Sequence, residues 1–155
     1  MFKINVITNN ISWYKFIKNP NNYIDRKIKK INFKNHKASK QIFFCTILLS
    51  GNRQIKKLNK KFRNKNKTTD VLSFPFQTKE ELSNKLKQEK DIYLGDIIIN
   101  LNKIKSKKIL KNFKKEFDCL WVHGLVHLFG HDHKNNKDFI KMNKIEKEYL
   151  NLINV

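Results

Sequence analysis

The chain has 155 residues, with 34 Lys and Arg against 13 Asp and Glu, and a formal net charge of +21. A chain of this length is expected to form a single domain, residues 1–155, with its own core. It holds no run of about 18 apolar residues, and its first residues alternate in polarity instead of forming a signal peptide. A membrane-spanning protein and a secreted protein are therefore both disfavoured.

The two cysteines, Cys45 and Cys119, each lie inside an apolar run. Free cysteine in such surroundings usually behaves as a small buried hydrophobe. Two cysteines so placed do not resemble the disulfide framework of a small secreted domain. The sequence therefore predicts a reducing, cytoplasmic setting.

Lysine dominates the positive charge, because only Arg26, Arg53 and Arg63 are arginines and the other 31 of the 34 basic residues are Lys. A basic surface gains affinity for a nucleic acid by releasing the counterions around the phosphates. An abundance of Lys, Asn, Ile and Phe is also expected from an AT-rich genome, which is our hypothesis for part of the charge. A balanced base composition in the coding sequence would remove that explanation. A polyanionic partner is favoured in either case.

The first part of the chain predicts two strands and a helix. Apolar residues alternate over 2–7, which favours a strand, and Trp13 and Phe16 belong to a short helical turn. Residues 21–33 carry apolar side chains at helical spacing and predict an amphipathic helix. The run from Gln41 to Ser50 is apolar throughout, which is typical of a strand inside a sheet.

A second helix is predicted next, with Asn52 as its N-cap and Arg63 at its end. Its apolar face consists of Ile55, Leu58 and Phe62. A polar loop follows over 64–70. Residues 71–76 then favour a strand, which should be an edge strand or end at Pro75, because Pro75 has no N–H to donate.

The remaining elements complete an α+β fold. Residues 77–91 are charged and predict a mobile, partly helical excursion, and the last strand is expected over 93–100. A Lys-rich helix is expected from Ile104 onward, and whether it continues into 117–130 is left open. An amphipathic helix with apolar residues from Phe139 to Leu152 closes the chain. We therefore expect a small mixed four-stranded sheet, about five helices and a zincin-like metal helix near the C-terminus.

Four of the five histidines lie within eleven residues, from His123 to His133. His123 and His127 are four residues apart in an apolar helical run, so they share a helix face, about 5–6 Å apart at Cβ. Gly130 can take the left-handed conformation that often ends a helix, which lets the chain bring His133 back towards them. Three neutral imidazoles with an open fourth position are typical of a catalytic zinc site.

His131 would share the face of His127 only if the helix continued past Gly130, so it is interpreted as a loop residue near the site and not as a ligand. The alternative for the whole cluster is a histidine-rich surface patch without metal. Zinc is the expected ion, nickel or copper could occupy the same nitrogens, and magnesium is disfavoured because it prefers oxygen ligands. The candidates to orient the imidazoles are Asp70, Asp96 and Asp132.

The residue after the first histidine argues against peptide hydrolysis. In the His-Glu-x-x-His metalloproteases, that Glu is the general base, and here the position is Gly124. Arg63 is the best electrophilic candidate, because a guanidinium can bind two phosphate oxygens and offset charge in a transition state. Its alternative is an ordinary surface arginine or one paired with an acid.

The block from His123 to His133 resembles the signature of the YbeY family of bacterial endoribonucleases. Met142 and Glu146 also match the C-terminal helix of that family. Three further blocks agree in order and spacing: Leu58-Asn-Lys-Lys-Phe-Arg63, Thr69-Asp-Val-Leu-Ser-Phe-Pro-Phe76 and Leu94-Gly-Asp-Ile-Ile-Ile99. The chain departs from the family at His131, where a Tyr is usual, and in its abundance of Lys.

The resemblance implies that zinc is held by His123, His127 and His133 and that Arg63 is a functional residue of the same cleft. It also implies a cytoplasmic enzyme that acts on single-stranded RNA in ribosomal RNA processing, notably at the small-subunit 3′ end, and in ribosome quality control. RNA is then the partner, with no DNA and no membrane expected. The nucleophile stays open between an activated water and the RNA 2′-OH.

Two other functions are retained as alternatives. One is an RNA-binding ribosome assembly factor in which the metal is mainly structural, which the excess of Lys and the missing base favour slightly. The other is a zinc peptidase, which Gly124 disfavours. The protein partners and the oligomeric state are not determined by the sequence.

Overall fold

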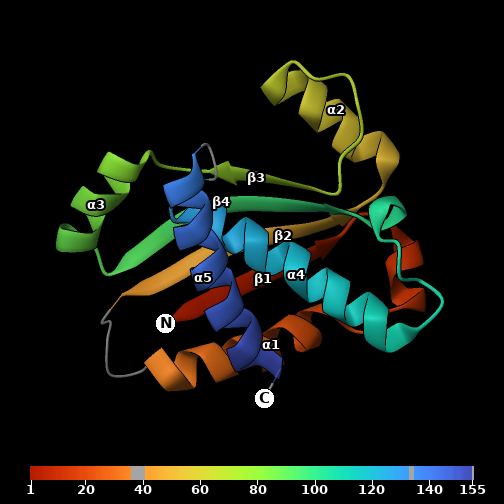
Figure 1. Ribbon diagram of the computed structural model, residues 1–155, viewed down its shortest axis with the longest axis horizontal. Helices are drawn as coiled ribbons and strands as arrows, with labels where there is room; N and C mark the ends of the chain where they lie inside the picture. Colours follow the sequence, from red (N-terminus) through yellow and green to blue (C-terminus); the bar gives the residue numbers. More distant parts are fainter. Residues whose placement is uncertain (36–40, 133–134, 155) are drawn as a thin grey trace.

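The computed structural model describes residues 1–35, 41–132 and 135–154. Four strands form one mixed sheet in the order β1-β2-β4-β3 (Figure 1). Strand β2 pairs parallel with β1 on one side and with β4 on the other, and β3 pairs antiparallel with β4 at the edge. The strands are β1 Phe2–Thr8, β2 Ile42–Ser50, β3 Val71–Pro75 and β4 Asp91–Asn100.

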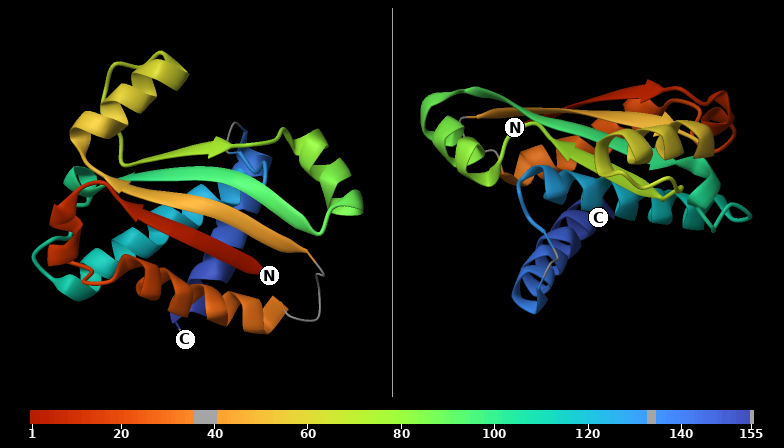
Figure 2. Two further views of the ribbon diagram at one scale, coloured as in Figure 1. Left: turned by 180° about the vertical axis from the view of Figure 1, so that it is seen from behind. Right: turned by 90° about the horizontal axis from the view of Figure 1, so that it is seen from above.

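The described residues also form five α-helices and two short 3-10 helices around the sheet. They are η1 Ile11–Lys15, α1 Pro20–Asn35, α2 Asn52–Arg63, α3 Lys79–Gln88, η2 Leu101–Lys103, α4 Leu110–Leu128 and α5 Asn136–Asn154. Helices α1, α4 and α5 lie on one side of the sheet, with α5 crossing α4 on its outer side (Figures 1 and 2). The main core lies between this helical layer and the sheet.

The opposite face of the sheet carries a second, smaller core under α2. It consists of the buried side chains of Ile55, Leu72 and Ile98, with Leu58 and Phe74 packed against them. The helix thereby holds its C-terminal end beside the start of β3. Asn64 ends α2 in the left-handed conformation, with φ 54°. This packing places Arg63 at the edge of the sheet formed by β3, which α4 also contacts.

The structure confirms the α+β class, with a mixed four-stranded sheet and five α-helices. It also confirms an interior strand at 42–50 and an edge strand that ends at Pro75. Among the described residues, no helix has both the length and the apolar character needed to cross a membrane.

Two details of the predicted elements are wrong, and one prediction is confirmed in part. Helix α2 has Gly51 as its N-cap instead of Asn52, and the Asn52 side chain accepts a hydrogen bond from Asn100 Nδ2 at 2.9 Å. The prediction of a partly helical segment at 77–91 is confirmed: it holds the regular helix α3 with a capping box, in which Thr78 and Glu81 bind each other's backbone N–H. The Lys-rich helix does not begin at Ile104, which follows η2 in a loop.

Candidate active site

A cleft of about 430 Å³ opens where α4, α5 and the edge of the sheet meet. Its walls come from the end of α2, the residues leading into β3, the outer side of α4 and the middle of α5. The lining residues are Arg63, Thr69, Asp70, Val71, Ser73, Cys119, Leu120, His123, His127 and Glu146. Segments far apart in the sequence thus converge on the two helical histidines.

Helix α4 presents His123 and His127 to this cleft. It runs unbroken from Leu110 to Leu128, and its opposite side packs on the sheet so closely that a Cβ on Gly124 would lie 2.6 Å from Ile97 Cγ2. Gly130 then has a φ of +76°, the left-handed conformation expected after a helix end. The chain therefore turns away immediately after the second histidine.

Each of the two imidazoles is oriented through its Nδ1 atom. The Nδ1–H of His123 donates to Glu146 Oε1 at 2.8 Å, and the Nδ1–H of His127 donates to the backbone carbonyl of His131 at 2.9 Å. The Nε2 atoms face each other at 3.1 Å, with the ring planes nearly perpendicular. With Nδ1 protonated in both neutral rings, two Nε2 lone pairs meet at this point.

Two lone pairs at that distance repel each other unless a cation or an additional proton lies between them. Zinc–nitrogen bonds of about 2.0–2.1 Å in tetrahedral geometry separate two donor atoms by roughly 3.3 Å, close to the observed 3.1 Å. A carboxylate or carbonyl on the distal nitrogen is also the usual support of a metal-binding histidine. The donor set of the described residues therefore fits a zinc ion.

The third predicted ligand, His133, lies outside the described residues. Within the described part of the chain, no group of three His, Cys, Asp or Glu side chains is close enough to hold a metal ion. His131 follows the end of α4, and its side chain lines a different hollow, with Phe129 and Tyr149. Burial, together with the charges of Lys141 and Lys79, lowers the pKa of His131.

Arg63 faces the histidines from the other wall of the cleft. Its Nη2 donates to the Ser73 carbonyl at 3.2 Å, and its Cζ lies 6.0 Å from the centroid of the Phe74 ring. Within the described residues, the other guanidinium N–H groups have no protein acceptor, and no acid pairs with Arg63. One terminal nitrogen of the guanidinium is thus fixed, and its remaining N–H donors can bind an anionic ligand.

Two residues of the cleft were not anticipated from the sequence. Glu146, rather than Asp70, Asp96 or Asp132, holds the Nδ1 of His123, and Asp96 instead accepts a hydrogen bond from Tyr93 on β4. Cys119, expected to be a buried hydrophobe, is exposed in the cleft, whereas Cys45 is buried as expected. Glu146 lies one helical turn after the buried Met142, and that spacing was the available signal.

The fold and the cleft together define a small α+β protein with a histidine pair and an arginine at one edge of its sheet. The family model for "Endoribonuclease YbeY" matches residues 7–154, and the chain belongs to the YbeY endoribonuclease family. An endoribonuclease YbeY of Pelagibacter ubique is 46% identical over 149 residues, covering 94% of this chain and 92% of the relative. One of Thermodesulfovibrio yellowstonii is 36% identical over 129 residues, covering 81% and 74%.

A solved structure supports the fold independently of these sequences. The solution structure of TM1509 from Thermotoga maritima superposes with a TM-score of 0.60, covering 97% of this chain and 89% of the other, at 22% identity. At that identity, the likeness concerns the fold alone.

Proposed function

We propose that this chain is a metal-dependent endoribonuclease that cleaves single-stranded RNA in the cleft between α4, α5 and β3. The observation that carries the proposal is the pair of Nε2 atoms of His123 and His127, 3.1 Å apart, in a cleft that also holds the guanidinium of Arg63. Membership of the YbeY endoribonuclease family supports RNA as the substrate.

The metal ligands in this proposal are His123, His127 and His133, and zinc is the expected ion. When bound, such an ion supplies Lewis-acid polarisation of a phosphoryl oxygen and activation of water. The protein contributes the orientation of the imidazoles: Glu146 and the His131 carbonyl keep both Nδ1 atoms protonated, so that both Nε2 atoms present lone pairs. Nickel or copper are expected to substitute in vitro.

Arg63 acts on the phosphate in the same proposal. Its fork of N–H donors can bind two oxygens of the scissile phosphate and offset the charge that builds up in the transition state. The Ser73 carbonyl and the Phe74 ring hold the guanidinium in place before the substrate arrives. Preorganisation of this kind lowers the cost of positioning the phosphate.

The proposed cellular substrate is ribosomal RNA, at the 3′ end of the small-subunit RNA, in the cytoplasm, with a further role in ribosome quality control. The net charge of +21 favours a polyanionic substrate. The product ends distinguish the two nucleophiles. A 3′-OH end indicates an activated water, and a cyclic phosphate indicates attack by the RNA 2′-OH.

A second candidate function is an RNA-binding assembly factor with a structural metal. Within the described residues, Glu146 and Asp70 are the only acids that line the cleft, and both accept hydrogen bonds. Neither carboxylate is therefore available as a general base, which favours this second function. Removal of metal by a chelator separates the two. An enzyme loses cleavage, keeps its circular-dichroism spectrum and recovers on addition of zinc. If the metal is structural, its removal should abolish both the folded circular-dichroism spectrum and RNA binding.

A further inference from the structure

The N-terminal half of α4 carries lysines on the same i, i+4 row of side chains as the histidines of the cleft. Lys111 and Lys115 precede Cys119 at intervals of four residues, and the same interval leads on to His123 and His127. Residues four apart are neighbours on a helix surface, and each step of four turns the row by about 40° around the helix axis. Lys111, Lys115 and Cys119 are exposed, and the two histidines are half-buried at the cleft. One strip of side chains therefore winds by about 160° around α4 from His127 to Lys111, with Lys115 about 80° around the axis from His123.

The acids of this half of the helix do not neutralise the two lysines. Glu116 accepts hydrogen bonds from the backbone N–H groups of Lys105 and Ser106, at 2.9 and 3.0 Å. Asp118 is buried and paired with Lys27 at 3.0 Å. Over the described part of the chain, the side chains of Lys111 and Lys115 make no hydrogen bond and no ion pair. Both ammonium groups can therefore bind an external anion.

We propose that Lys111 and Lys115 bind phosphates of the single-stranded RNA on one side of the scissile bond, so that the strand leaves the cleft along α4. This inference rests on the proposed function, because it extends the same cleft. At a rise of about 1.5 Å per residue, Lys115 stands roughly 12 Å and Lys111 roughly 18 Å from His123 along the helix. These separations correspond to roughly two to five phosphates of one strand, spaced 3.4 Å or more apart.

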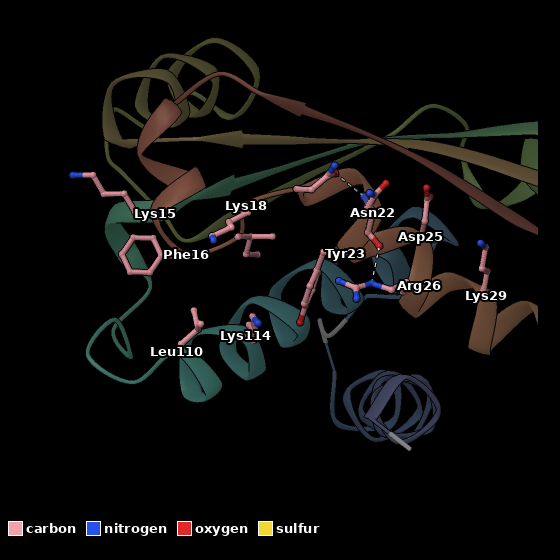
Figure 3. Close-up of a pocket in the computed structure, with 12 residues that line it drawn as sticks. Lys15, Phe16, Lys18, Asn22, Tyr23, Asp25, Arg26, Lys29, Leu110 and Lys114 are labelled. Carbon is pink, nitrogen blue, oxygen red and sulfur yellow. Dashed lines mark hydrogen bonds between the residues drawn. The ribbon is translucent and has the colours of Figure 1, made fainter.

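A second basic groove, between α1 and the start of α4, is the rival path for RNA. It has a volume of about 660 Å³ and is lined by Lys15, Lys18, Arg26, Lys29 and Lys114, among others (Figure 3). Lys114 lies on the α1 side of α4, with its Nζ 5.9 Å from the Tyr23 ring centroid. This groove shares no lining residue with the cleft, so a strand held there does not lead to the histidines along the same face.

Cys119 lies in this strip, and the reactivity of its thiol can report whether RNA is bound there. Cys119 lies between Lys115 and His123 and is exposed, so an RNA strand in the proposed path covers its thiol. Cys45 is 3% exposed, and burial raises its pKa to about 12, which makes it an unreactive internal control. Burial and the charge of Asp118 raise the pKa of Cys119 as well, and alkylation is therefore best followed at mildly alkaline pH.

The test compares two double variants that each remove two lysines. Lys111→Gln/Lys115→Gln removes the two lysine charges of the proposed path. Lys18→Gln/Lys114→Gln removes two lysine charges from the rival groove and serves as the matched control. Binding of a single-stranded RNA that spans the site is measured without added metal as a function of salt. Each phosphate contact on a single strand adds about 0.7 to the slope of log affinity against log salt, so the first variant should lower the slope by about 1.4 and the control should leave it unchanged.

The alkylation rate of Cys119 gives a second readout. RNA should protect Cys119 in the parent and in the control variant, and the protection should be lost in Lys111→Gln/Lys115→Gln. Equal slopes for the two variants, a loss confined to the control, or RNA that binds without protecting Cys119 would each overturn the inference. Neither measurement depends on cleavage. A protein that binds along the lysines but cleaves no RNA refutes the proposed function alone, and one that cleaves without using these lysines refutes this inference alone.

Discussion

His123 and His127 act as a pair because each imidazole is held by a different partner. Glu146 on α5 and the carbonyl of His131 occupy the Nδ1 atoms, so only the Nε2 atoms face the cleft. The spacing of His123 and His127 was sufficient to predict a shared helix face. Glu146 could not be paired with His123 in advance, because the two residues are 23 positions apart and the chain turns between them in a way that the sequence does not encode locally.

Replacing Glu146 with Gln should weaken metal binding without unfolding the protein. The amide keeps a hydrogen-bond acceptor but loses the charge that makes the His123 ring more basic, and loss of such a partner typically costs about 10–100-fold in metal affinity. Competition with a chelator measures the affinity for zinc. Glu148→Gln, on the same helix and exposed, is the matched control. Equal zinc affinities for the two variants would contradict a supporting role for Glu146.

Replacing Arg63 with Lys should remove most RNA cleavage and leave zinc binding unchanged. Lysine keeps the charge but cannot form two parallel hydrogen bonds to a phosphate, and removal of a donor to a transition-state oxyanion costs on the order of 10²–10³ in rate. Single-turnover cleavage with saturating protein isolates this step. Arg53→Lys, on the same helix, controls for the substitution itself. Cleavage by Arg63→Lys at the rate of the parent would remove Arg63 from the proposed mechanism.

At the scale of the elements, the position of α4 determines the site. Gly124 explains how this helix comes so near the sheet, because any Cβ there would collide with Ile97. The missing base therefore has a packing reason: position 124 faces the sheet and not the cleft. The apolar run 117–129 predicted the helix correctly but did not indicate that the side of the helix with Cys119 is exposed at the cleft. Cys119 was therefore expected to be buried. The helix start was misjudged because lysines carry no apolar periodicity.

A buried carboxylate fastens α4 to α1. Asp118 accepts hydrogen bonds from the Tyr23 hydroxyl at 3.0 Å and Trp121 Nε1 at 2.9 Å, and it pairs with Lys27 at 3.0 Å. Burial and the Asp118 charge raise the pKa of Tyr23, so its hydroxyl stays protonated. This cluster fixes the rotation of α4 about its axis and hence the direction of its histidines.

Asp118→Ala should lower the free energy of unfolding by about 3 kcal/mol, because two buried donors, the Tyr23 hydroxyl and Trp121 Nε1, lose their acceptor and the half-buried Lys27 loses its ion pair. Urea denaturation measures this change. Asp25→Ala, an exposed acid on α1, should change it by less than about 0.5 kcal/mol. Similar losses for the two variants would show that the buried cluster does not stabilise the helix pair.

Glu116 connects the loop after η2 to α4 and gives a pH-dependent contribution. Burial acts to raise its pKa, but the hydrogen bonds from the Lys105 and Ser106 N–H groups outweigh it and hold the pKa below the ordinary value of 4.5. A carboxyl group whose pKa is lower in the folded state than in the unfolded state stabilises the fold at pH values above its unfolded-state pKa. This contribution is lost as the pH falls through the folded-state pKa.

Glu116→Gln should therefore cost about 1 kcal/mol of unfolding free energy at pH 7. The difference from the parent should shrink in acid, once the pH is below the folded pKa of Glu116. Thermal denaturation across this range follows the change, with Glu80→Gln as the exposed control. A difference that is the same at both pH values would contradict the linkage.

At the scale of the whole molecule, helices α1, α4 and α5 cover one side of the sheet and α2 packs on the other. The order of strands and helices followed from patterning, as did the edge position of Pro75. The assembly of the cleft did not, because it joins α2, β3, α4 and α5 through contacts between distant segments. The +21 charge favours RNA, but composition alone does not distinguish phosphate contacts from solvated background.

The central claim is that the histidine pair supports metal-dependent cleavage of RNA. The most direct test is cleavage of a small-subunit ribosomal RNA 3′ precursor by the zinc-loaded parent and by His127→Ala, purified side by side and matched by circular dichroism. We predict that the parent cleaves the precursor, that chelator abolishes cleavage, and that His127→Ala is inactive. Equal cleavage by both proteins, or none by either with zinc bound to the parent, would contradict the claim.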